Sequence, residues 1–184
     1  MTEEERRIAA ALAAGDARAA LPLLINRYGE EVYRRCRRLL GMDADADDVS
    51  QTVFLQAFEA IQRGCQVENP GAWLRGIARH RCLDKLGGRR RDPLLIEEEE
   101  LERVPDADSM DPFAIDPGMS QALDECLDRL DQRSRVAILL RFNDQLSYEA
   151  IGQLTGDRPG ALRVRVSRAL IALRECMEKK GGTP

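Results

Sequence analysis

The sequence predicts an all-α protein made of two small helical domains joined by an acidic linker, with a helix-turn-helix in the second domain. Alanine, leucine and arginine are abundant and aromatic residues make up only 4% of the 184 residues, which favours helices. Residues 92–118 hold ten acids, one arginine and four prolines, a composition typical of a linker. Residues 147–177 read as two helical patterns separated by a glycine and a proline, at the spacing of a tight turn. The predicted domains are therefore residues 1–91 and 119–184.

Four helices are predicted in the first domain, because apolar residues recur there every three or four positions. Asp16 is the predicted N-cap of the second helix, and Gly41 its C-terminal stop. Asn69 and Pro70 fit the cap and the first turn of the fourth helix. The second helix also carries four arginines near its end, which are predicted to lie in solvent. The helices cover residues 2–14, 17–40, 45–61 and 70–91, and the arginines are Arg34, Arg35, Arg37 and Arg38.

Two of these helices carry charge in a pattern that suggests a binding surface. The helix at 45–61 opens with three aspartates and has a polar face, which fits docking to a basic partner. The same acids stabilise the helix dipole, so a purely structural role stays open. Residues 73–91 hold seven Lys or Arg and one Asp, as a nucleic-acid-binding segment does. Trp73 is predicted to anchor the core rather than to stack on a base, and the run Arg89–Arg91 also fits a solvated segment.

The second domain is predicted to end in a helix-turn-helix. Ser147 caps the first helix of this motif and Gly156 ends it, while Pro159 opens the second helix. Gly152 leaves room for the two helices to cross closely. Before the motif, two more helices are predicted at 119–130 and 133–142.

The last helix of the chain is predicted to bind DNA. Residues 158–174 contain five arginines and no acid. Arginine neutralises phosphates and binds guanine through two hydrogen bonds in the major groove. The alternative is a solvated face on an ordinary helical bundle. The predicted buried stripe of this helix is Leu162, Val166, Ala169, Leu170 and Leu173.

The sequence offers nothing on which enzyme chemistry or a cofactor would rest. It has no glycine-rich phosphate loop, no nucleophile elbow and no paired-histidine zinc motif. His80 and Cys82 lack a second pair to complete a metal site, so no metal is predicted. The five cysteines form no C-x-x-C pair, and their odd number argues against a disulfide framework. Cys36, Cys126 and Cys176 are therefore predicted to be small core residues.

A cytoplasmic protein without membrane insertion is expected. No apolar run approaches the roughly 20 residues that span a bilayer. The first seven residues are charged rather than basic and then apolar, unlike a signal peptide. The net charge of −4 is also unlike that of a protein that coats DNA without specificity.

Three segments, in order along the chain, resemble motifs of the extracytoplasmic-function (ECF) sigma factors, the small two-domain class of bacterial transcription initiation factors. Residues 45–58 read DADDVSQTVFLQAF, similar to an acidic opening followed by Q-E-x-F-L-x-A-[FW]. Residues 69–91 resemble N-P-x-A-W-L…I-A-x-N…D…R-R, through NPGAWL, Ile77-Ala78, Asp84 and three arginines. Residues 146–169 resemble L-S-Y-E-E-I-A…G…V-G-T-V-K-S-R-x-x-R-A. The resemblance covers almost the whole chain.

The resemblance implies that the first domain binds core RNA polymerase and captures the −10 element of promoter DNA, and that the second domain reads the −35 element. The chain itself would not be an enzyme. The residues implied to bind core polymerase are Asp45, Asp47, Asp48, Gln51, Thr52, Phe54 and Gln56. Those implied to contact the −10 element are Asn69, Arg75, Arg79, His80, Arg89 and Arg90. Those implied to contact the −35 element are Arg158, Arg163, Arg165, Ser167 and Arg168.

The chain departs from the family pattern at several positions. Thr52 stands where the family carries an acid, and His80 where asparagine is common. Residues 160–165, GALRVR, replace G-T-V-K-S-R and lose two hydroxyls. Gly152 replaces the usual alanine. These departures bear on single contacts to polymerase or promoter.

Other functions and a further partner stay open. A conventional helix-turn-helix regulator would act without core polymerase, but it leaves the acidic helix and the basic segment at 73–91 unexplained. A protein that binds polymerase without recognising promoters is a second alternative. Many ECF sigma factors are sequestered by an anti-sigma factor, so such a partner is expected here. Self-inhibition by the acidic run Glu97–Glu100 lying on basic residues at 158–168 or 89–91 is the alternative.

Overall fold

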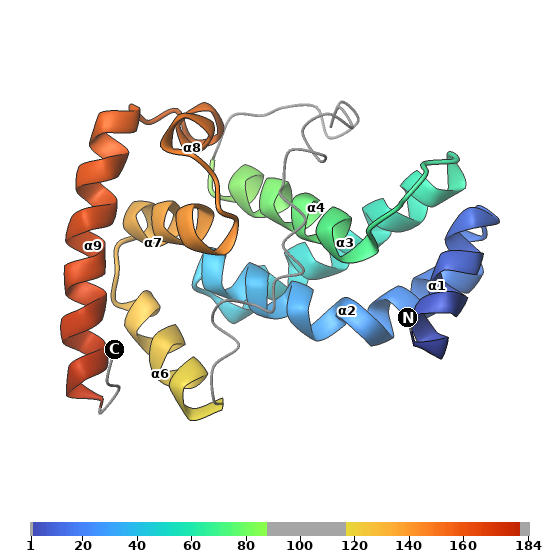
Figure 1. The fold of residues 1–184 in the computed structure, drawn as a ribbon, viewed down its shortest axis with the longest axis horizontal. Helices are drawn as coiled ribbons and strands as arrows, with labels where there is room; N and C mark the ends of the chain where they lie inside the picture. The colour runs from blue at the N-terminus through green and yellow to red at the C-terminus, as the bar shows by residue number, and fades with distance from the viewer. Residues whose placement is uncertain (1, 88–116, 181–184) are drawn as a thin grey trace. The chain divides into compact units, whose positions relative to one another are not determined.

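The computed structural model describes residues 2–87 and 117–180, and the secondary structure in these ranges is entirely helical (Figure 1). The chain divides into two compact units, residues 1–85 and 86–184. The predicted all-α class is confirmed. The first unit contains α1 (Glu3–Ala13), α2 (Ala17–Leu40), α3 (Asp43–Gln62) and α4 (Pro70–Lys85). The second contains α6 (Pro117–Asp128), α7 (Gln132–Ile138), the π-helix η2 (Leu139–Asn143), α8 (Tyr148–Thr155) and α9 (Pro159–Lys179).

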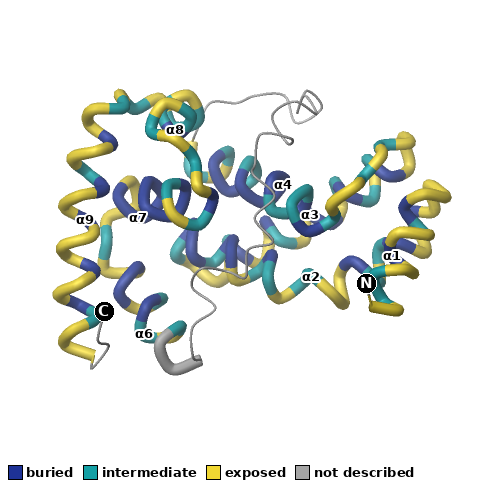
Figure 2. The backbone as a smooth tube through the Cα atoms, in the orientation of Figure 1, coloured by how far each residue is buried: buried dark blue, intermediate teal, exposed yellow. Residues whose placement is uncertain are grey.

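In the first unit α2 packs against α1, α3 and α4, and the apolar stripes of the four helices form one core. Buried and exposed positions alternate along each helix, as expected for amphipathic helices (Figure 2). α2 continues through Pro22 without a break. The largest fully buried side chains of this unit are Ile8, Leu24, Val32, Val53, Ile61 and Leu74.

Polar side chains and glycines fix the helix ends. The Thr2 hydroxyl accepts from the Glu5 N–H at 3.2 Å, and the Glu5 carboxylate accepts from the Thr2 N–H at 2.6 Å, which forms a capping box. The Asp16 carboxylate accepts from two backbone N–H groups at the start of α2. Gly41 ends α2 with φ of 77°, a conformation that glycine adopts without strain. The predicted cap and stop of α2 are confirmed.

α3 begins earlier than predicted. Its first residue is Asp43 rather than Asp45, so only Gly41 and Met42 connect it to α2. The Arg37 guanidinium near the end of α2 pairs with the Asp43 carboxylate at 2.5 Å. This ion pair ties the start of α3 to the preceding helix.

Two of the arginines predicted to lie in solvent are buried instead. Arg35 and Arg38 are 8% and 6% exposed, and Arg79 of α4 is 4% exposed. Burial lowers the pKa of Arg35 to about 10, with smaller contributions from the charges of Arg79 and Arg75. The Arg35 side chain therefore stays charged at neutral pH inside the unit.

In the second unit α9 packs against α6, α7 and α8. α6 begins at Pro117, so the last two residues of the predicted linker belong to this helix. The Asp131 carboxylate caps α7 by accepting from the Ser134 N–H at 3.0 Å. The largest fully buried side chains of this unit are Leu127, Ile138, Leu140, Ile151, Leu162 and Val166.

The single helix predicted at 133–142 is two elements. α7 ends at Ile138, and the chain continues as the π-helix Leu139–Asn143, whose turn is wider than that of an α-helix. Gln145 follows with φ of 54°, the only positive φ at a non-glycine residue in the described part of the chain. The wide turn and this residue redirect the chain into α8.

A disulfide bond joins Cys126 of α6 to Cys176 of α9. The predicted core position of both cysteines is confirmed, whereas the argument against a disulfide from their odd number is wrong for this pair. The two cysteines lie 50 residues apart, and only the packing of α6 on α9 brings them together. Cys36, Cys65 and Cys82 are reduced; Cys36 and Cys82 are buried, and Cys65 is partly exposed.

Candidate nucleic-acid and polymerase interfaces

α8, the turn after it and α9 form the predicted helix-turn-helix (Figure 1). The Ser147 hydroxyl accepts from the Ala150 N–H at 3.1 Å, and Gly156 ends α8 with φ of 79°. A Cβ atom on Gly152 would lie 2.7 Å from the Asp157 carbonyl oxygen, closer than real Cβ contacts come. The predicted close approach at Gly152 is confirmed, and it fixes the position of α9 relative to α8.

Arg165 braces this turn from inside the unit. Its guanidinium lies 2.7 Å from the Asp157 carboxylate, and the two side chains are only 22% and 24% exposed. The sequence predicts Arg165 as a DNA contact, but a half-buried ion pair already occupies its guanidinium. This ion pair supports the turn, and the DNA contact of Arg165 stays a prediction.

The other four predicted −35 contacts are exposed on α9. The Arg163 guanidinium lies 3.7 Å from the Glu149 carboxylate and 5.6 Å from the centre of the Tyr148 ring. Sequence reasoning missed Arg141, which lies 5.3 Å from the same ring and donates to the Leu146 carbonyl oxygen at 3.1 Å. No sequence signal marks it, because its position depends on the π-helix. The four exposed residues are Arg158, Arg163, Ser167 and Arg168.

α9 also exposes apolar side chains beside its arginines. Leu170, predicted to be buried, is 41% exposed, because Leu162, Val166 and Leu173 already fill the inward face. Val164 and Ile171 are exposed as well. The outer surface of α9 is therefore both basic and apolar.

Four of the predicted core-polymerase residues lie on the exposed surface of α3. Asp47, Asp48, Gln51 and Thr52 are all exposed, and the Thr52 hydroxyl donates to the Asp48 carbonyl oxygen at 2.9 Å. Leu55, which the sequence reasoning omitted, is 59% exposed one turn further along. Helical spacing places these side chains on one face, where they present two acids, one amide, one hydroxyl and one large apolar group.

Three other predicted core-polymerase residues contact their own unit. Phe54 is only 9% exposed and belongs to the core, so it is not presented to a partner. The Gln56 amide oxygen accepts from Arg81 Nε at 2.7 Å. The Asp45 carboxylate lies 3.0 Å from Lys85 Nζ and raises the pKa of that amine.

Among the described residues, three of the predicted −10 contacts have partners within their own unit, and a fourth is buried. Asn69 caps α4 by accepting from a backbone N–H at 3.0 Å. The Arg75 guanidinium lies 3.1 Å from the Glu31 carboxylate, and Arg79 is buried. His80 Nδ1 lies 2.9 Å from a carbonyl oxygen one turn earlier. Two predicted contacts lie outside the described residues: Arg89 and Arg90.

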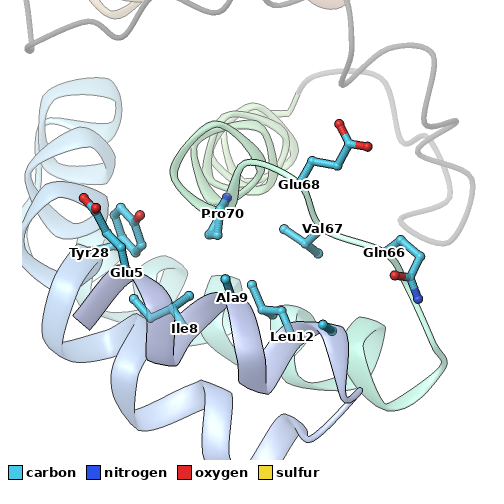
Figure 3. A pocket seen from close by; sticks show the side chains of 10 residues that line it. Glu5, Ile8, Ala9, Leu12, Tyr28, Gln66, Val67, Glu68 and Pro70 are labelled. Carbon is cyan, nitrogen blue, oxygen red and sulfur yellow. The ribbon is translucent and has the colours of Figure 1, made fainter. Parts of the chain in front are cut away.

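A cavity of about 480 Å³ lies between α1, α2 and the loop before α4 (Figure 3). Ile8, Leu12 and Val67 give it an apolar wall, while Glu5 and Glu68 stand at its edge. No Lys or Arg lines it within the described ranges. Carboxylates repel phosphate, so this cavity is not a site for the backbone of a nucleic acid.

Residues 2–87 and 117–180 contain neither a membrane-spanning helix nor a cluster of metal ligands. No helix there is long and apolar enough to cross a bilayer. No three His, Cys, Asp or Glu side chains there lie close enough to hold a metal ion.

Comparisons with known proteins place both units in one family. Residues 24–92 match sigma-70 region 2, and residues 120–173 match sigma-70 region 4. The chain is 33% identical to the ECF RNA polymerase sigma factor SigE of Mycolicibacterium smegmatis over 91% of this chain, and it spans 66% of that protein's length. It is 32% identical to the ECF RNA polymerase sigma factor SigD of Mycobacterium tuberculosis, over 95% of this chain and 86% of SigD.

A solved structure, described as CnrH in complex with the cytosolic domain of CnrY, also aligns with this chain. The alignment covers 96% of this chain and 99% of that chain, with 24% identity and a TM-score of 0.46. A likeness at this level supports neither a fold nor a function, so the family rests on the sequence matches. By the matches to sigma-70 regions 2 and 4 and to SigD, the chain belongs to the ECF RNA polymerase sigma factors.

Proposed function

We propose that this chain directs core RNA polymerase to promoters, with α9 reading the −35 element in the major groove. The observation that carries this proposal is the exposed basic surface at the N-terminal half of α9. The close approach of α8 to the turn at Gly152 fixes the position of this half of the helix. A recognition helix reads base edges from this end. The polymerase supplies the chemistry, so the chain needs no enzymatic activity of its own.

Core polymerase is proposed to bind the exposed face of α3. Asp48, Gln51, Thr52 and Leu55 lie together there, so an apolar side chain lies beside an acid, an amide and a hydroxyl. A central apolar group with a polar rim is typical of protein interfaces. The acids suit a basic partner surface, and Leu55 supplies the apolar contact that the aspartates cannot.

The −10 element is proposed to be held as a single strand along α4. Arg75 and Arg79 are committed to their own unit, so we expect them to shape this surface rather than to bind the strand. Phosphate contacts then fall to Arg89 and Arg90. Trp73 is half-buried, which leaves part of its ring for stacking on an extruded base.

We also expect a cytoplasmic location and an anti-sigma factor that keeps the chain inactive. The exposed faces of α3 and α9 both combine charge with large apolar groups, Leu55 on one and Ile171 on the other. A partner that covers both faces gains from the linkage of two contacts, so each contact alone can be weak. Such a partner would be recovered with the chain from uninduced cells.

Run-off transcription with purified core polymerase and genomic fragments tests the proposal. Specific starts that depend on this chain support it, whereas duplex binding that needs no core polymerase would favour a conventional regulator. Arg168→Ala should weaken promoter-dependent transcription about 5- to 150-fold if Arg168 reads a base, from roughly 1–3 kcal/mol per base contact. Arg174→Ala, at an exposed arginine nearer the C-terminus of α9, is the matched control. Equal activity of the two variants would mean that α9 reads the promoter through another surface.

A further inference from the structure

The Cys126–Cys176 disulfide holds α6 against the last turns of α9. Two other contacts support this junction. The Lys180 ammonium pairs with the Glu125 carboxylate, next to the bond in sequence. Leu127 is buried against the unit. α6 has only 12 residues, and a helix of that length is marginal in water without tertiary contacts. Its place in the unit therefore depends on the bond, the ion pair and the buried leucines Leu123 and Leu127 together.

The helix-turn-helix is held by different contacts. Ile151, Leu162 and Val166 are at most 1% exposed and pack α8 against the first half of α9. The half-buried pair between Arg165 and Asp157 braces the turn. Cys176 lies ten residues beyond Val166 on α9, about 15 Å further along the helix axis. The two halves of α9 therefore have separate supports.

We infer that the Cys126–Cys176 bond is a redox-controlled clasp: a dithiol opens it, and opening releases α6 and the last turns of α9 while the helix-turn-helix stays folded. The second unit then has one part whose order depends on the redox state of the bond and one part, the N-terminal half of α9, whose order does not.

The exposure of the two cysteine residues sets the order of the chemistry. Cys176 is 8% exposed and Cys126 only 1%, so a reductant reaches Cys176 first. One thiolate of the dithiol attacks Cys176 Sγ, the S–S bond breaks, and Cys126 leaves as a thiolate that takes a proton from water. The second thiol attacks the mixed disulfide and frees Cys176, which is also protonated. The dithiol ends as a disulfide, so two electrons have passed to the protein. Protein dithiols such as thioredoxin keep thiols reduced inside cells.

Hydrogen exchange of the full-length protein tests the release. The bridged protein and the same protein reduced with dithiothreitol are compared peptide by peptide. We expect amide protection in α6 and residues 173–180 to fall at least about tenfold on reduction, with less than a twofold change in residues 148–166. Unchanged protection in α6, or loss of protection throughout the second unit, would overturn the inference. The double variant Cys126→Ser/Cys176→Ser should match the reduced protein and ignore dithiothreitol, while Cys65→Ser should behave as the wild type.

A second measurement tests whether the bond opens in the folded state. The native protein is equilibrated in buffers with rising ratios of glutathione disulfide to glutathione, its free thiols are alkylated, and the bridged fraction is read by mass spectrometry. We expect the bridged fraction to rise from mostly open to mostly closed across the series. A protein that stays bridged at every ratio has a purely structural bond, and a protein that never bridges has none; both results contradict the clasp.

Discussion

Gly152→Ala should destabilise the second unit, although alanine favours helices and is the usual residue of the family at this position. In the interior of a helix the change from glycine to alanine gains about 0.5–1 kcal/mol. Here the new methyl group would lie 2.7 Å from the Asp157 carbonyl oxygen. That carbonyl cannot retreat freely, because the Asp157 carboxylate pairs with Arg165 at 2.7 Å and the Asp157 N–H donates to the Thr155 hydroxyl at 3.4 Å. The contact should therefore outweigh the gain in helix propensity.

The magnitude follows from these opposing effects. Forcing an extra methyl group into a packed site costs typically about 1–3 kcal/mol, and subtracting the gain in helix propensity leaves a net loss centred on about 1 kcal/mol. A loss of this size lowers the melting temperature of a domain of under 100 residues by roughly 4–8 °C. Gly160→Ala makes the same chemical change in the first turn of α9, where a Cβ atom would meet nothing within 4 Å. This control should be neutral or slightly stabilising.

Two spectroscopic signals separate the units in the full-length chain. Trp73 is the only tryptophan and lies in α4, so its fluorescence follows the first unit. Far-ultraviolet circular dichroism follows the helices of both units. Gly152→Ala should shift a transition that the dichroism shows and the fluorescence does not. A melting temperature for Gly152→Ala at or above that of Gly160→Ala would refute the reasoning, because it would mean that the turn yields at little cost.

Three further predictions concern single charges. Asp48→Lys should weaken binding to core polymerase, measured by titration of labelled core, without changing the melting temperature. Glu30→Lys, at an exposed position of α2, is the control. Equal affinities of the two variants would exclude the α3 face as the binding surface. Hydrogen bonds from Ser134 hold the pKa of Asp131 below its ordinary value of 3.8, so this carboxylate stabilises the fold above that pH and stops doing so as the pH falls through its lowered pKa. Asp131→Asn should accordingly flatten the acid dependence of the urea midpoint of the second unit, and an unaltered acid profile would rule this out. Arg165→Ala should cost about 1–2 kcal/mol of stability, between an exposed and a buried ion pair; a folded, fully stable variant with lost promoter binding would instead make Arg165 a DNA contact.

Local patterns in the sequence were sufficient for most helices and for the turn. The caps at Asp16, Asn69 and Ser147 and the stop at Gly156 depend on one or two residues each, so their sequence signals are complete. The helix-turn-helix follows from these signals and from the spacing of Gly152. The exposed acids of α3 and arginines of α9 were also predictable, because charged side chains lie on the helix face opposite the buried apolar stripe.

What the sequence could not predict depends on contacts between distant residues. The cysteine pair is separated by 50 residues, and only the packing of α6 on α9 brings the two thiols together. Arg165 was expected to face DNA because nothing local shows that it reaches back to Asp157. Phe54 fits the motif of a binding face by its position, yet the packing of α3 turns it into the core. The residue pattern along a helix predicts which of its faces is apolar, but it does not predict which side chains from other elements pack against that face.

The cations of α4 are paired with acids or buried, so their binding to a nucleic acid would release fewer counterions than their number suggests. Residues 73–91 hold seven Lys or Arg, but Arg75, Arg81 and Lys85 lie within 4 Å of acids of the same unit, and Arg79 is buried. A cation with a fixed carboxylate beside it displaces no counterion from a strand. If all seven met phosphates, the logarithm of affinity for a single strand would fall with the logarithm of salt with a slope of about −5; with these four removed the slope is about −2. Capture of the −10 strand should therefore tolerate changes in cellular ionic strength that would abolish binding to a surface of the same composition with its charges unpaired.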